Sequence, residues 1–536
     1  MLRQPTRLRM RVKLCLLSIN CNHRHYSLGV YVLAAMVRQH LPEVAVRVRN
    51  HTVRATARHL LFDALAEPAD VYGLSVHHGH GPMAVALARD IRRLQPGAVI
   101  IFGGVDVAAL EGETLAGWVD WCVVGEGEWT LVHLLQALQR GEPPAPRPGL
   151  VRPGQGAALA AVAGARLPQQ SNLDDFPSPY LSGVFDAWDS HATAYIETYR
   201  GCVWNCNFCH EGRGRSRIAA YSEERVRAEL SLLLARPEVR LIEFYDTIFN
   251  VEPARTRWLL QHLLAHNDRG VRFIGEFMLE WLDDEEIELL GRAGFALMEV
   301  GLQSVNQRTL RRSGRKTDLD RFAERARAVL DGTDTDLCID AMFGLDDETL
   351  DDFRATLDWI GRLQGANGRR PTPILFATHV HPATRLYRKK GDLMLLDAGV
   401  GGRQLTTPTL ALRDTERFYE LFYGYLCLRA TFPQTMNQVT GALLRHAGIE
   451  LSQVYAGVAR VLKADAGTRV LFEQADWTEF RSNPMLRLYI DAIDRGYLLA
   501  VADELGAASQ TLRDELRRCV ALEQGEPERA TEVGVV

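Results

Sequence analysis

The sequence predicts an α/β protein with three parts: an N-terminal doubly wound parallel sheet, a partial β/α barrel and a helical C-terminal region. Three observations predict this order. Short apolar runs alternate with amphipathic stretches over residues 12–140, the alternation resumes over 190–395, and helical patterns alone follow from residue 396. Continuous apolar strands separated by helices are typical of parallel sheets that are covered on both faces.

The N-terminal sheet is predicted from five apolar runs rich in β-branched residues. These are VKLCLLSI, VAVRVRN, DVYGLSV, AVIIFGG and DWCVVGEG, and amphipathic stretches such as LGVYVLAAMVRQHL and MAVALARDIRRLQ lie between them. A sheet of this kind binds its ligand in the crevice beyond the carboxyl ends of its strands. We therefore expect residues 1–140 to form a ligand-binding domain.

The composition changes after this domain. Arg140–Pro168 is rich in Pro, Gly and Ala and shows no hydrophobic period, which is typical of a linker. We expect residues 141–189 to form a linker and a docking segment.

Six further strands predict the barrel over residues 190–395: AYIET, LIEFYDT, VRFIGEF, LMEVGLQS, DLCIDAMFG and ILFATHV. In such barrels the functional side chains lie at the carboxyl ends of the strands. Residues 396–536 are expected to form a helical domain with a disordered tail, because the last dozen residues are rich in Glu, Pro and Gly.

Bulk composition excludes several classes of protein. Of the 536 residues, 47% are hydrophobic and 24% are charged, and the formal net charge is −5. This balance gives no electrostatic footprint for nucleic acid, and no stretch reaches the roughly 18 apolar residues of a membrane helix. Most of the nine cysteines stand alone in apolar runs, which indicates a reducing compartment. We expect a cytoplasmic protein without a nucleic-acid or membrane partner.

Three of the nine cysteines lie within eight residues. Cys202, Cys206 and Cys209 have the spacing C-x3-C-x2-C and directly follow a predicted strand. Disulfides would leave one thiol over, and a structural zinc site needs a fourth ligand, for which His210 lacks the usual spacing. A 4Fe–4S cubane accounts better for the motif, because three thiolates leave one of its four irons open to a small molecule.

The motif in its strand–loop context closely resembles the radical S-adenosylmethionine (SAM) superfamily, including the aromatic Phe208 before the third cysteine. The resemblance implies a partial (β/α)6 radical SAM barrel in which the three cysteines are the catalytic metal ligands. It also implies that the open iron binds SAM and that an external electron donor, such as flavodoxin or ferredoxin, reduces the cluster. Phe208 and the following polar residues of the later strand ends are the implied SAM-binding positions: Asp246, Asn250, Glu276, Glu299 and Gln303.

The alternative for each of these polar residues is an interior group paired with an arginine. Two further stretches resemble the superfamily. CIDAMFGL, from Cys338, resembles the fifth strand near the adenine, and HVHPATRLY, from His379, resembles the end of the sixth strand in the cobalamin-dependent branch.

A Rossmann-like domain ahead of such a barrel is similar to the layout of the cobalamin-binding radical SAM enzymes, the class B methyltransferases. The expected motifs D-x-H-x-x-G, S-x-L and G-G have counterparts in NHRHYSLG at 22–29, SVH at 75–77 and GG at 103–104. The first motif departs from the pattern, because His25 is one residue too far from Gly29, which argues against a histidine ligand below cobalt. The implied cobalamin-binding residues are His25, Ser75, Gly103, Gly104, Gly125 and Glu126, the last two within VVGEGE.

Several side chains near these motifs leave alternatives open. The alternative for the whole N-terminal domain is a retained fold that binds nothing. His77, His78 and His80 are interpreted as corrin contacts rather than as a metal site. Trp204 and the arginines Arg213, Arg215 and Arg217 flank the cysteines; these arginines could bind a substrate carboxylate or phosphate, or form a solvated loop.

The resemblance implies a radical SAM transferase that uses a 4Fe–4S cluster, SAM and cobalamin to methylate carbon in a small-molecule or natural-product substrate. One alternative is transfer of a 3-amino-3-carboxypropyl group, for instance to a soft acceptor such as arsenic near Cys21 or Cys338. Another is cobalamin-assisted cyclisation or oxidation. A sensor that signals through the helical C-terminal part is the non-enzymatic alternative.

Overall fold

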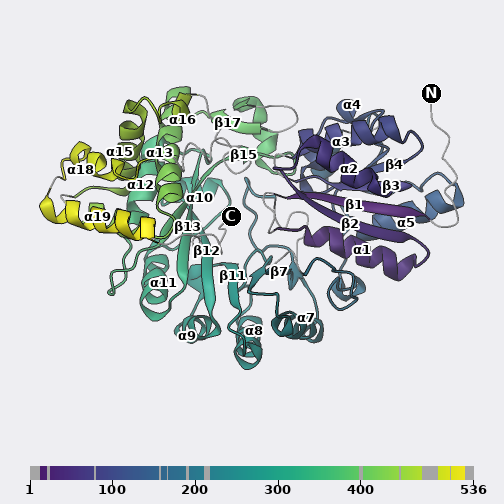
Figure 1. Ribbon diagram of the computed structural model, residues 1–536, viewed down its shortest axis with the longest axis horizontal. Helices are drawn as coiled ribbons and strands as arrows, with labels where there is room; N and C mark the ends of the chain where they lie inside the picture. The colour runs from purple at the N-terminus through teal and green to yellow at the C-terminus, as the bar shows by residue number, and fades with distance from the viewer. Residues whose placement is uncertain are drawn as a thin grey trace.

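The computed structural model describes most of the chain in three successive regions (Figure 1). The described residues are 12–20, 25–77, 80–155, 158–165, 167–188, 192–210, 218–396, 402–445, 448–473, 493–507 and 509–525. Five side chains singled out above, and the expected disordered tail, lie outside this part: Cys21, His78, Arg213, Arg215 and Arg217. No described helix is long and apolar enough to span a membrane.

The N-terminal domain, purple in Figure 1, is a six-stranded sheet in the order β2-β1-β3-β4-β5-β6. Its first five strands are parallel. The strands are β1 (Lys13–Asn20), β2 (Ala45–Thr52), β3 (Val71–Ser75), β4 (Val99–Gly103), β5 (Trp121–Val123) and β6 (Leu150–Val151). The helices are α1 (Leu28–His40), α2 (Ala57–Ala66), α3 (Gly81–Leu94), η1 (Val105–Ala109), α4 (Gly112–Leu115) and α5 (Glu128–Arg140).

The sheet is covered on both faces, which confirms the predicted doubly wound fold. Leu14 and Leu16 of β1 pack in a cluster with α1 and α5. Cys15 and Leu17 of the same strand pack in a second cluster with α2 and α3. Successive side chains of a strand point to opposite faces, so an apolar run without alternation is what this sheet requires.

Part of the segment expected to be a linker belongs to this sheet. β6 pairs antiparallel with β5, and α6 (Leu159–Ala163) packs against η1. Gly149 permits the return, because its φ is +82° and a Cβ there would lie 2.3 Å from the carbonyl oxygen of Val124. A two-residue edge strand has no hydrophobic period, so the sequence pattern did not predict it. The docking segment that follows contains η2 (Leu173–Asp175).

The barrel is a second six-stranded sheet, in the order β14-β13-β12-β11-β10-β7, with all neighbours parallel. The strands are β7 (Thr193–Ile196), β10 (Leu241–Phe244), β11 (Arg272–Phe277), β12 (Phe295–Gln303), β13 (Asp336–Phe343) and β14 (Thr372–Ala377). The helices are α7 (Glu223–Ala235), α8 (Pro253–His266), η4 (Leu279–Trp281), α9 (Asp284–Ala293), α10 (Gln307–Arg312), α11 (Leu319–Gly332) and α12 (Leu350–Arg362). Neighbouring strands follow one another along the chain, which confirms the predicted partial barrel.

One face of the barrel sheet changes from apolar to acidic along the strands. Four buried side chains form a small apolar cluster on this face: Ile274, Leu297, Cys338 and Ile374. Two residues further along three of these strands are Glu276, Glu299 and Asp340. Because the side-chain period of a strand is two, these carboxylates share the face of the apolar cluster and lie nearer the carboxyl ends.

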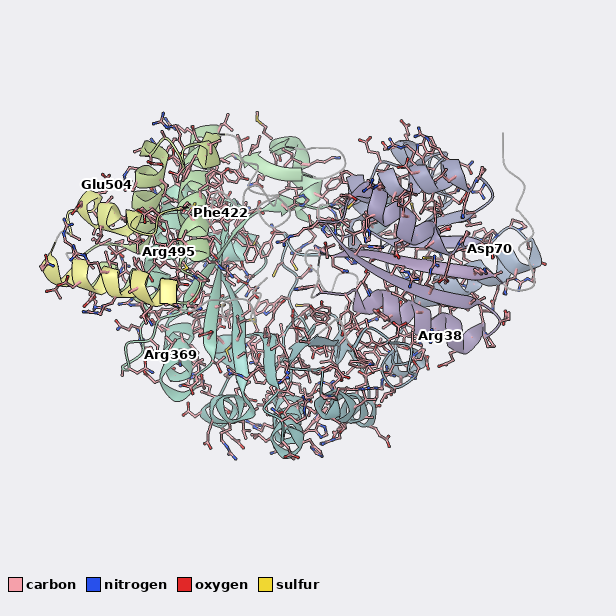
Figure 2. All side chains as sticks on the ribbon, in the orientation of Figure 1. Arg38, Asp70, Arg369, Phe422, Arg495 and Glu504 are labelled. Atoms are coloured by element: carbon pink, nitrogen blue, oxygen red, sulfur yellow. The ribbon has the colours of Figure 1, made fainter. Side chains whose placement is uncertain are left out.

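The C-terminal region begins with a small antiparallel sheet and continues in helices, green to yellow in Figure 1. Its elements are β15 (His379–Val380), η5 (Leu386–Asp392), β16 (Met394–Leu396), β17 (Gly402–Thr406), α13 (Leu412–Thr431), α14 (Met436–Leu444), α15 (Leu451–Ala464), α16 (Val470–Glu473), α18 (Tyr497–Glu504) and α19 (Gln510–Gly525). Phe418 of α13 stacks on Phe343 of β13 at 4.1 Å between ring centroids. Arg495, labelled in Figure 2, donates to the carbonyl of Thr431 at 2.8 Å. The first contact packs α13 against the barrel, and the second joins the C-terminal end of α13 to the segment that precedes α18.

Candidate active site

The three cysteines lie in the loop that follows the first barrel strand. The short strand β8 (Tyr199–Arg200) pairs with β9 (Ala219–Ala220), and Gly201, with φ +112°, turns the chain into Cys202. Cys206 is buried, whereas Cys202 and Cys209 are partly exposed. In the described part of the chain, no three His, Cys, Asp or Glu side chains are placed to hold a single metal ion. A cubane does not require such a convergence, because each thiolate binds a different iron.

Asp246 fixes the chain just ahead of this loop. Its Oδ1 accepts hydrogen bonds from the backbone N–H of Thr198 at 2.7 Å and of Tyr199 at 3.3 Å, and its other oxygen accepts from the Thr198 hydroxyl. Burial raises the pKa of Asp246 to about 7, although the Thr198 bonds and the charge of Arg255 oppose the rise. The carboxylate is thus engaged by the protein itself, and its contact with SAM stays a prediction.

The side chain of Asn250 is likewise engaged by the backbone of the barrel. Its side-chain amide donates to the carbonyl of Met278 at 2.9 Å and accepts from the N–H of the same residue at 2.9 Å. Asn250 therefore pairs with the backbone just beyond β11 as a neighbouring strand would. Phe208 lies in the cysteine loop and is partly exposed.

Two of the predicted residues lie side by side with two carboxylates that the sequence analysis did not name. Glu276 and Glu299 are register partners on β11 and β12. Burial and the Glu299 carboxylate raise the pKa of Glu243 on β10 to about 7. Burial, followed by the charges of Glu299 and Glu276, raises the pKa of Asp340 on β13 well above its ordinary value. The period-two pattern in LIEFY and CIDAM was the available signal for Glu243 and Asp340.

A cation from the C-terminal region faces this acidic group. Arg429 of α13 donates to the Tyr425 hydroxyl at 2.6 Å. Burial lowers the pKa of Arg429, but the charges of Tyr425, Cys338 and Glu299 raise it above its ordinary value. α13 thus contributes a charged side chain to the barrel face, which its sequence pattern did not indicate.

Gln303 ends β12 in a backbone conformation that glycine usually adopts, with φ +69°. The strand register shifts between Gly301 and Gln303, so a bulge redirects the side chain. Gln303 is 7% exposed, and its Oε1 has no hydrogen-bond partner in the structure. A buried acceptor without a partner requires an explanation, and a polar ligand such as SAM would supply one.

Arg315 is a site residue that sequence analysis missed. Its Nη1 lies 3.8 Å from Cys206 Sγ, its Nη2 donates to the carbonyl of Gly301 at 2.5 Å, and its guanidinium lies 5.7 Å from the centre of the Trp204 ring. It places a positive charge beside the cysteine loop, where thiolates and a cluster would bring negative charge. The stretch RRSGRKT looks like a solvated basic loop, so no sequence signal identified this arginine.

The glycines of the N-terminal domain lie where its parallel strands end. Gly104 has φ +101°, and a Cβ there would lie 2.4 Å from the Val76 carbonyl oxygen. A Cβ at Gly103 would meet nothing within 4 Å, so this position leaves open space that a side chain would fill. Ser75 Oγ lies 2.8 Å from His77 Nε2. These residues fit the close approach of a large planar cofactor.

The remaining predicted cobalamin-binding residues lie near the barrel and the docking segment. Gly125 has φ +85°, and Glu126 accepts from the backbone N–H of Gln170 at 2.8 Å. The His25 ring lies 5.8 Å from the ring of Tyr195 on β7. Next to it, the Tyr26 hydroxyl accepts from the N–H of Tyr195 at 3.0 Å. His25 therefore lies beside the first barrel strand.

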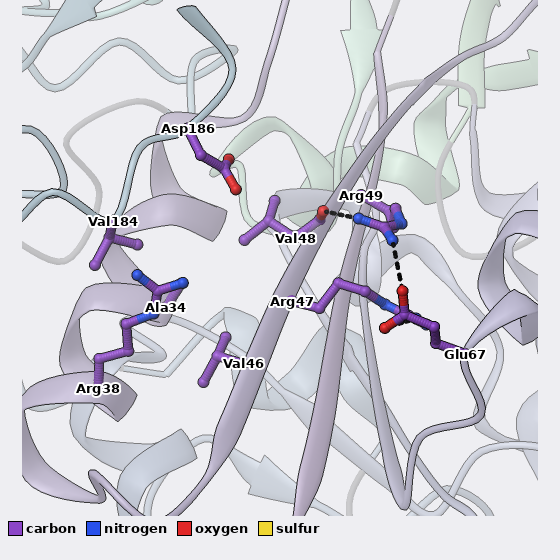
Figure 3. A pocket seen from close by; sticks show the side chains of 9 residues that line it. All are labelled: Ala34, Arg38, Val46, Arg47, Val48, Arg49, Glu67, Val184 and Asp186. Carbon is purple, nitrogen blue, oxygen red and sulfur yellow. Dashed lines mark hydrogen bonds and ion pairs between the residues drawn. The ribbon is translucent and has the colours of Figure 1, made fainter.

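One hollow of about 240 Å³ lies away from these residues (Figure 3). It is lined by Ala34, Arg38, Val46, Arg47, Val48, Arg49, Glu67, Val184 and Asp186. None of them is a predicted site residue, and Glu67 lies 3.2 Å from Arg47 and 3.9 Å from Arg49. The hollow is not part of the candidate active site.

Comparison with protein-family models accounts for both glycine and cysteine motifs. Residues 15–135 match the B12 binding domain, and residues 196–360 match the radical SAM superfamily. The chain carries a B12-binding domain followed by a radical SAM domain. Both domains that the sequence motifs resemble are thus confirmed.

Two curated relatives match part of the chain. The cobalamin-dependent radical SAM methyltransferase TokK of Streptomyces tokunonensis is 30% identical over 203 residues, covering 36% of this chain and 29% of TokK. The 2-(S-pantetheinyl)-carbapenam-3-carboxylate methyltransferase of Streptantibioticus cattleyicolor is 32% identical over 196 residues, covering 34% of this chain and 28% of that protein. The matched part of this chain thus spans less than a third of either relative.

Solved structures share the fold over most of the chain. The cobalamin-dependent radical SAM enzyme OxsB, with aqua-cobalamin and SAM bound, has a TM-score of 0.63 at 15% identity and covers 96% of this chain, with 84% of OxsB covered. The radical SAM methyltransferase TsrM of Kitasatospora setae, with cobalamin and a [4Fe-4S] cluster bound, has a TM-score of 0.58 at 15% identity. That match covers 89% of this chain and 99% of TsrM. The three-part architecture therefore occurs in both enzymes.

Proposed function

We propose that this chain is a cobalamin-dependent radical SAM methyltransferase that transfers a methyl group to a carbon atom of a small-molecule, natural-product substrate. The observation that carries the proposal is the pairing of a three-cysteine loop on a radical SAM barrel with the glycine loops of a B12-binding domain in one chain. The two relatives at 30% identity or more are both named as methyltransferases, which supports methyl transfer as the reaction.

The residues of the site divide between the cofactors. Cys202, Cys206 and Cys209 would hold the cluster, Gln303 and the barrel carboxylates would bind and orient SAM, and Gly103 would lie against the corrin. When bound, the cluster supplies the electron that cleaves SAM, and cobalamin carries the methyl group. Arg315 would offset the negative charge at Cys206.

The proposal includes two partners. The substrate is a small molecule bound between the two domains. The electron donor is an external one-electron protein such as flavodoxin or ferredoxin, because the family chemistry needs a reduced cluster and the chain carries no second cysteine cluster in its sequence.

The alternatives stated from the sequence have less support. Cys338, which could have indicated a soft acceptor, is 3% exposed within an apolar cluster, and burial raises its pKa. A relative named as a cyclase, the anaerobic magnesium-protoporphyrin IX monomethyl ester cyclase of Rubrivivax gelatinosus, matches at 23% identity. That identity is lower than that of either methyltransferase.

Product analysis of the anaerobically reconstituted protein tests the proposed reaction. With SAM and a reductant, we expect 5′-deoxyadenosine together with S-adenosylhomocysteine. Methylthioadenosine would contradict methyl transfer and indicate aminocarboxypropyl transfer, and deoxyadenosine without S-adenosylhomocysteine would indicate cyclisation or oxidation. The control is the double variant Cys122→Ala and Cys427→Ala, which removes two buried thiols outside the three-cysteine motif and should form the same products.

A further inference from the structure

We propose that Arg200 is a positioning residue that holds the B12-binding domain at a fixed distance from the cluster loop, Cys202–Cys209. The inference rests on the proposed function, because it concerns the spacing of the two cofactors that the function requires. It assigns a role to a residue that binds neither cofactor.

Arg200 joins the two domains because its largely buried guanidinium donates hydrogen bonds to two carboxylates; we call this pair of bonds the fork. It lies two residues ahead of Cys202, and its Nη1 donates to Glu128 Oε1 at 2.7 Å. Its Nε donates to Glu197 Oε2 at 2.8 Å. The Arg200 side chain is 16% exposed and that of Glu128 is 8% exposed. Glu197 and Arg200 belong to the barrel, whereas Glu128 belongs to the B12-binding domain, so one guanidinium connects both.

The fork connects rigid elements rather than mobile surface groups. Glu128 is the first residue of α5, directly after the turn that contains Gly125. Helix α5 is packed in the main core with Leu131 and Leu135 buried. The guanidinium of Arg200 is planar and holds its donors Nε and Nη1 in a fixed geometry, so a displacement of α5 relative to β8 would break this directional pair of hydrogen bonds.

The opposite end of the cluster loop has a second link to the same domain. The ring of His210, directly after Cys209, lies 5.0 Å from the ring of His381. His381 is 2% exposed, and its Nε2 lies 3.2 Å from Asp106 Oδ1. Asp106 lies in η1, two residues after Gly104. The two ends of the cluster loop thus face the two glycine loops that we assign to cobalamin.

Arg200 is the stronger of the two links because it balances several negative charges. Besides Glu128 and Glu197, the carboxylate of Glu126 lies 3.8 Å from its Nη1. Without the guanidinium, three carboxylates would face one another in a largely buried site, and like charges at this distance repel. Loss of Arg200 should therefore separate α5 from the cluster loop.

The test is the distance between the two cofactors in the holoenzyme. Reduced cluster and cob(II)alamin are both paramagnetic, so pulsed electron–electron double resonance reports their separation. In R200Q we expect unchanged iron and cobalamin content with a broader distribution of distances than in the wild type. R200K should broaden it less, because lysine keeps the charge but not the fork.

The matched control is R225Q. Arg225 donates to Glu229 at 2.8 Å, with side-chain exposures of 15% and 7%, and it also contacts the docking segment through the Phe176 carbonyl. Both partners of this ion pair belong to α7. We expect R225Q to keep the wild-type distance distribution. A wild-type distribution in fully loaded R200Q, or equal broadening in R225Q, would overturn the proposal.

Two further measurements apply if R200Q does not fold or if the wild type does not bind both cofactors. If R200Q does not fold, E128Q removes the link from the other domain and leaves Glu197 paired, and the same broadening is expected. If the wild type binds no cobalamin or no cluster, the proposed function fails, and hydrogen exchange on the apoprotein tests the link alone. Faster exchange at residues 123–128 in E128Q than in R225Q supports the link, and equal rates contradict it.

Discussion

At the scale of single residues, the site depends on which polar side chains are already hydrogen-bonded within the protein. Asp246 and Asn250 are engaged by backbone groups of the barrel, whereas Gln303 keeps a buried oxygen without a partner. Residue type and strand position predicted all three residues alike. Their difference depends on hydrogen bonds to distant backbone atoms, which a sequence pattern does not contain.

Arg315 gives the first prediction at this scale. Replacing it with Gln should lower the reduction potential of the cluster, because a positive charge near Cys206 favours the more negative reduced state. For a unit charge a few ångströms away at an effective dielectric constant near 20, the shift is on the order of 100 mV. Redox titration followed by electron paramagnetic resonance measures it.

The control for Arg315 is Arg312→Gln. Arg312 has a 65% exposed side chain and pairs with Asp347 at 2.9 Å. An equal shift of potential in both variants would mean that the effect comes from net charge and not from the position of Arg315.

Adjacent glycines give a second prediction. Gly104→Ala should destabilise the fold by about 1–3 kcal/mol, because its φ is +101° and the new Cβ would lie 2.4 Å from the Val76 carbonyl oxygen. Gly103→Ala should leave stability unchanged but weaken cobalamin binding, because its Cβ would enter open space. Thermal unfolding of the apoprotein and a cobalamin titration separate the two effects. Equal cobalamin affinity in Gly103→Ala and wild type would argue against a corrin at this loop.

At the scale of elements, packing between helices α7 and α8 sets a pH-dependent contribution to stability. His262 Nδ1 of α8 accepts a hydrogen bond from Arg227 Nη1 at 3.1 Å, because a guanidinium can only donate. Burial, followed by the charges of His266 and Arg227, lowers the pKa of His262 to about 4. The folded protein therefore holds the neutral imidazole, while the unfolded chain takes up a proton below its ordinary pKa near 6.5.

The third prediction follows from the direction of this pKa shift. The stabilisation from neutral His262 is complete above about pH 6.5 and is lost as the pH falls toward 4. Between pH 7.5 and 5 the loss is about 2 kcal/mol. The wild-type apoprotein should lose more stability than His262→Gln between pH 7.5 and 5. Denaturant unfolding at the two pH values measures the difference. His266→Gln should lose less stability than the wild type, because the His266 charge contributes to the lowered pKa of His262. A parallel loss in His262→Gln and wild type would contradict the assignment.

The elements themselves were largely predictable. Five strands of the N-terminal sheet and six of the barrel match the apolar runs in the sequence. Central strands such as β1 and β12 bury both faces, so their apolar pattern is recognised without knowledge of a partner strand. β6 and the bulge at Gln303 were not predictable. Each depends on a neighbouring strand: β6 on Cys122 and Val123 of β5, and the bulge on β13.

At the scale of the whole molecule, the order of the two domains follows from their motifs, but their contact does not. Arg200 and Glu128 are 72 residues apart, and Asp106 and His381 are 275 residues apart in the chain. The local sequence pattern around each of these residues does not predict which distant residue it contacts. The same is true of Arg429, which the C-terminal helix α13 brings to the acidic face of the barrel.

The claim that both cofactors bind to one chain is tested most directly by native mass spectrometry of the anaerobically reconstituted protein. We predict one 4Fe–4S cluster and one cobalamin on the same molecule. The variant with Cys202, Cys206 and Cys209 all changed to Ala should keep cobalamin and lose the cluster. A cluster retained in that variant, zinc on the wild-type cysteines, or wild-type protein that never carries cobalamin would contradict the account.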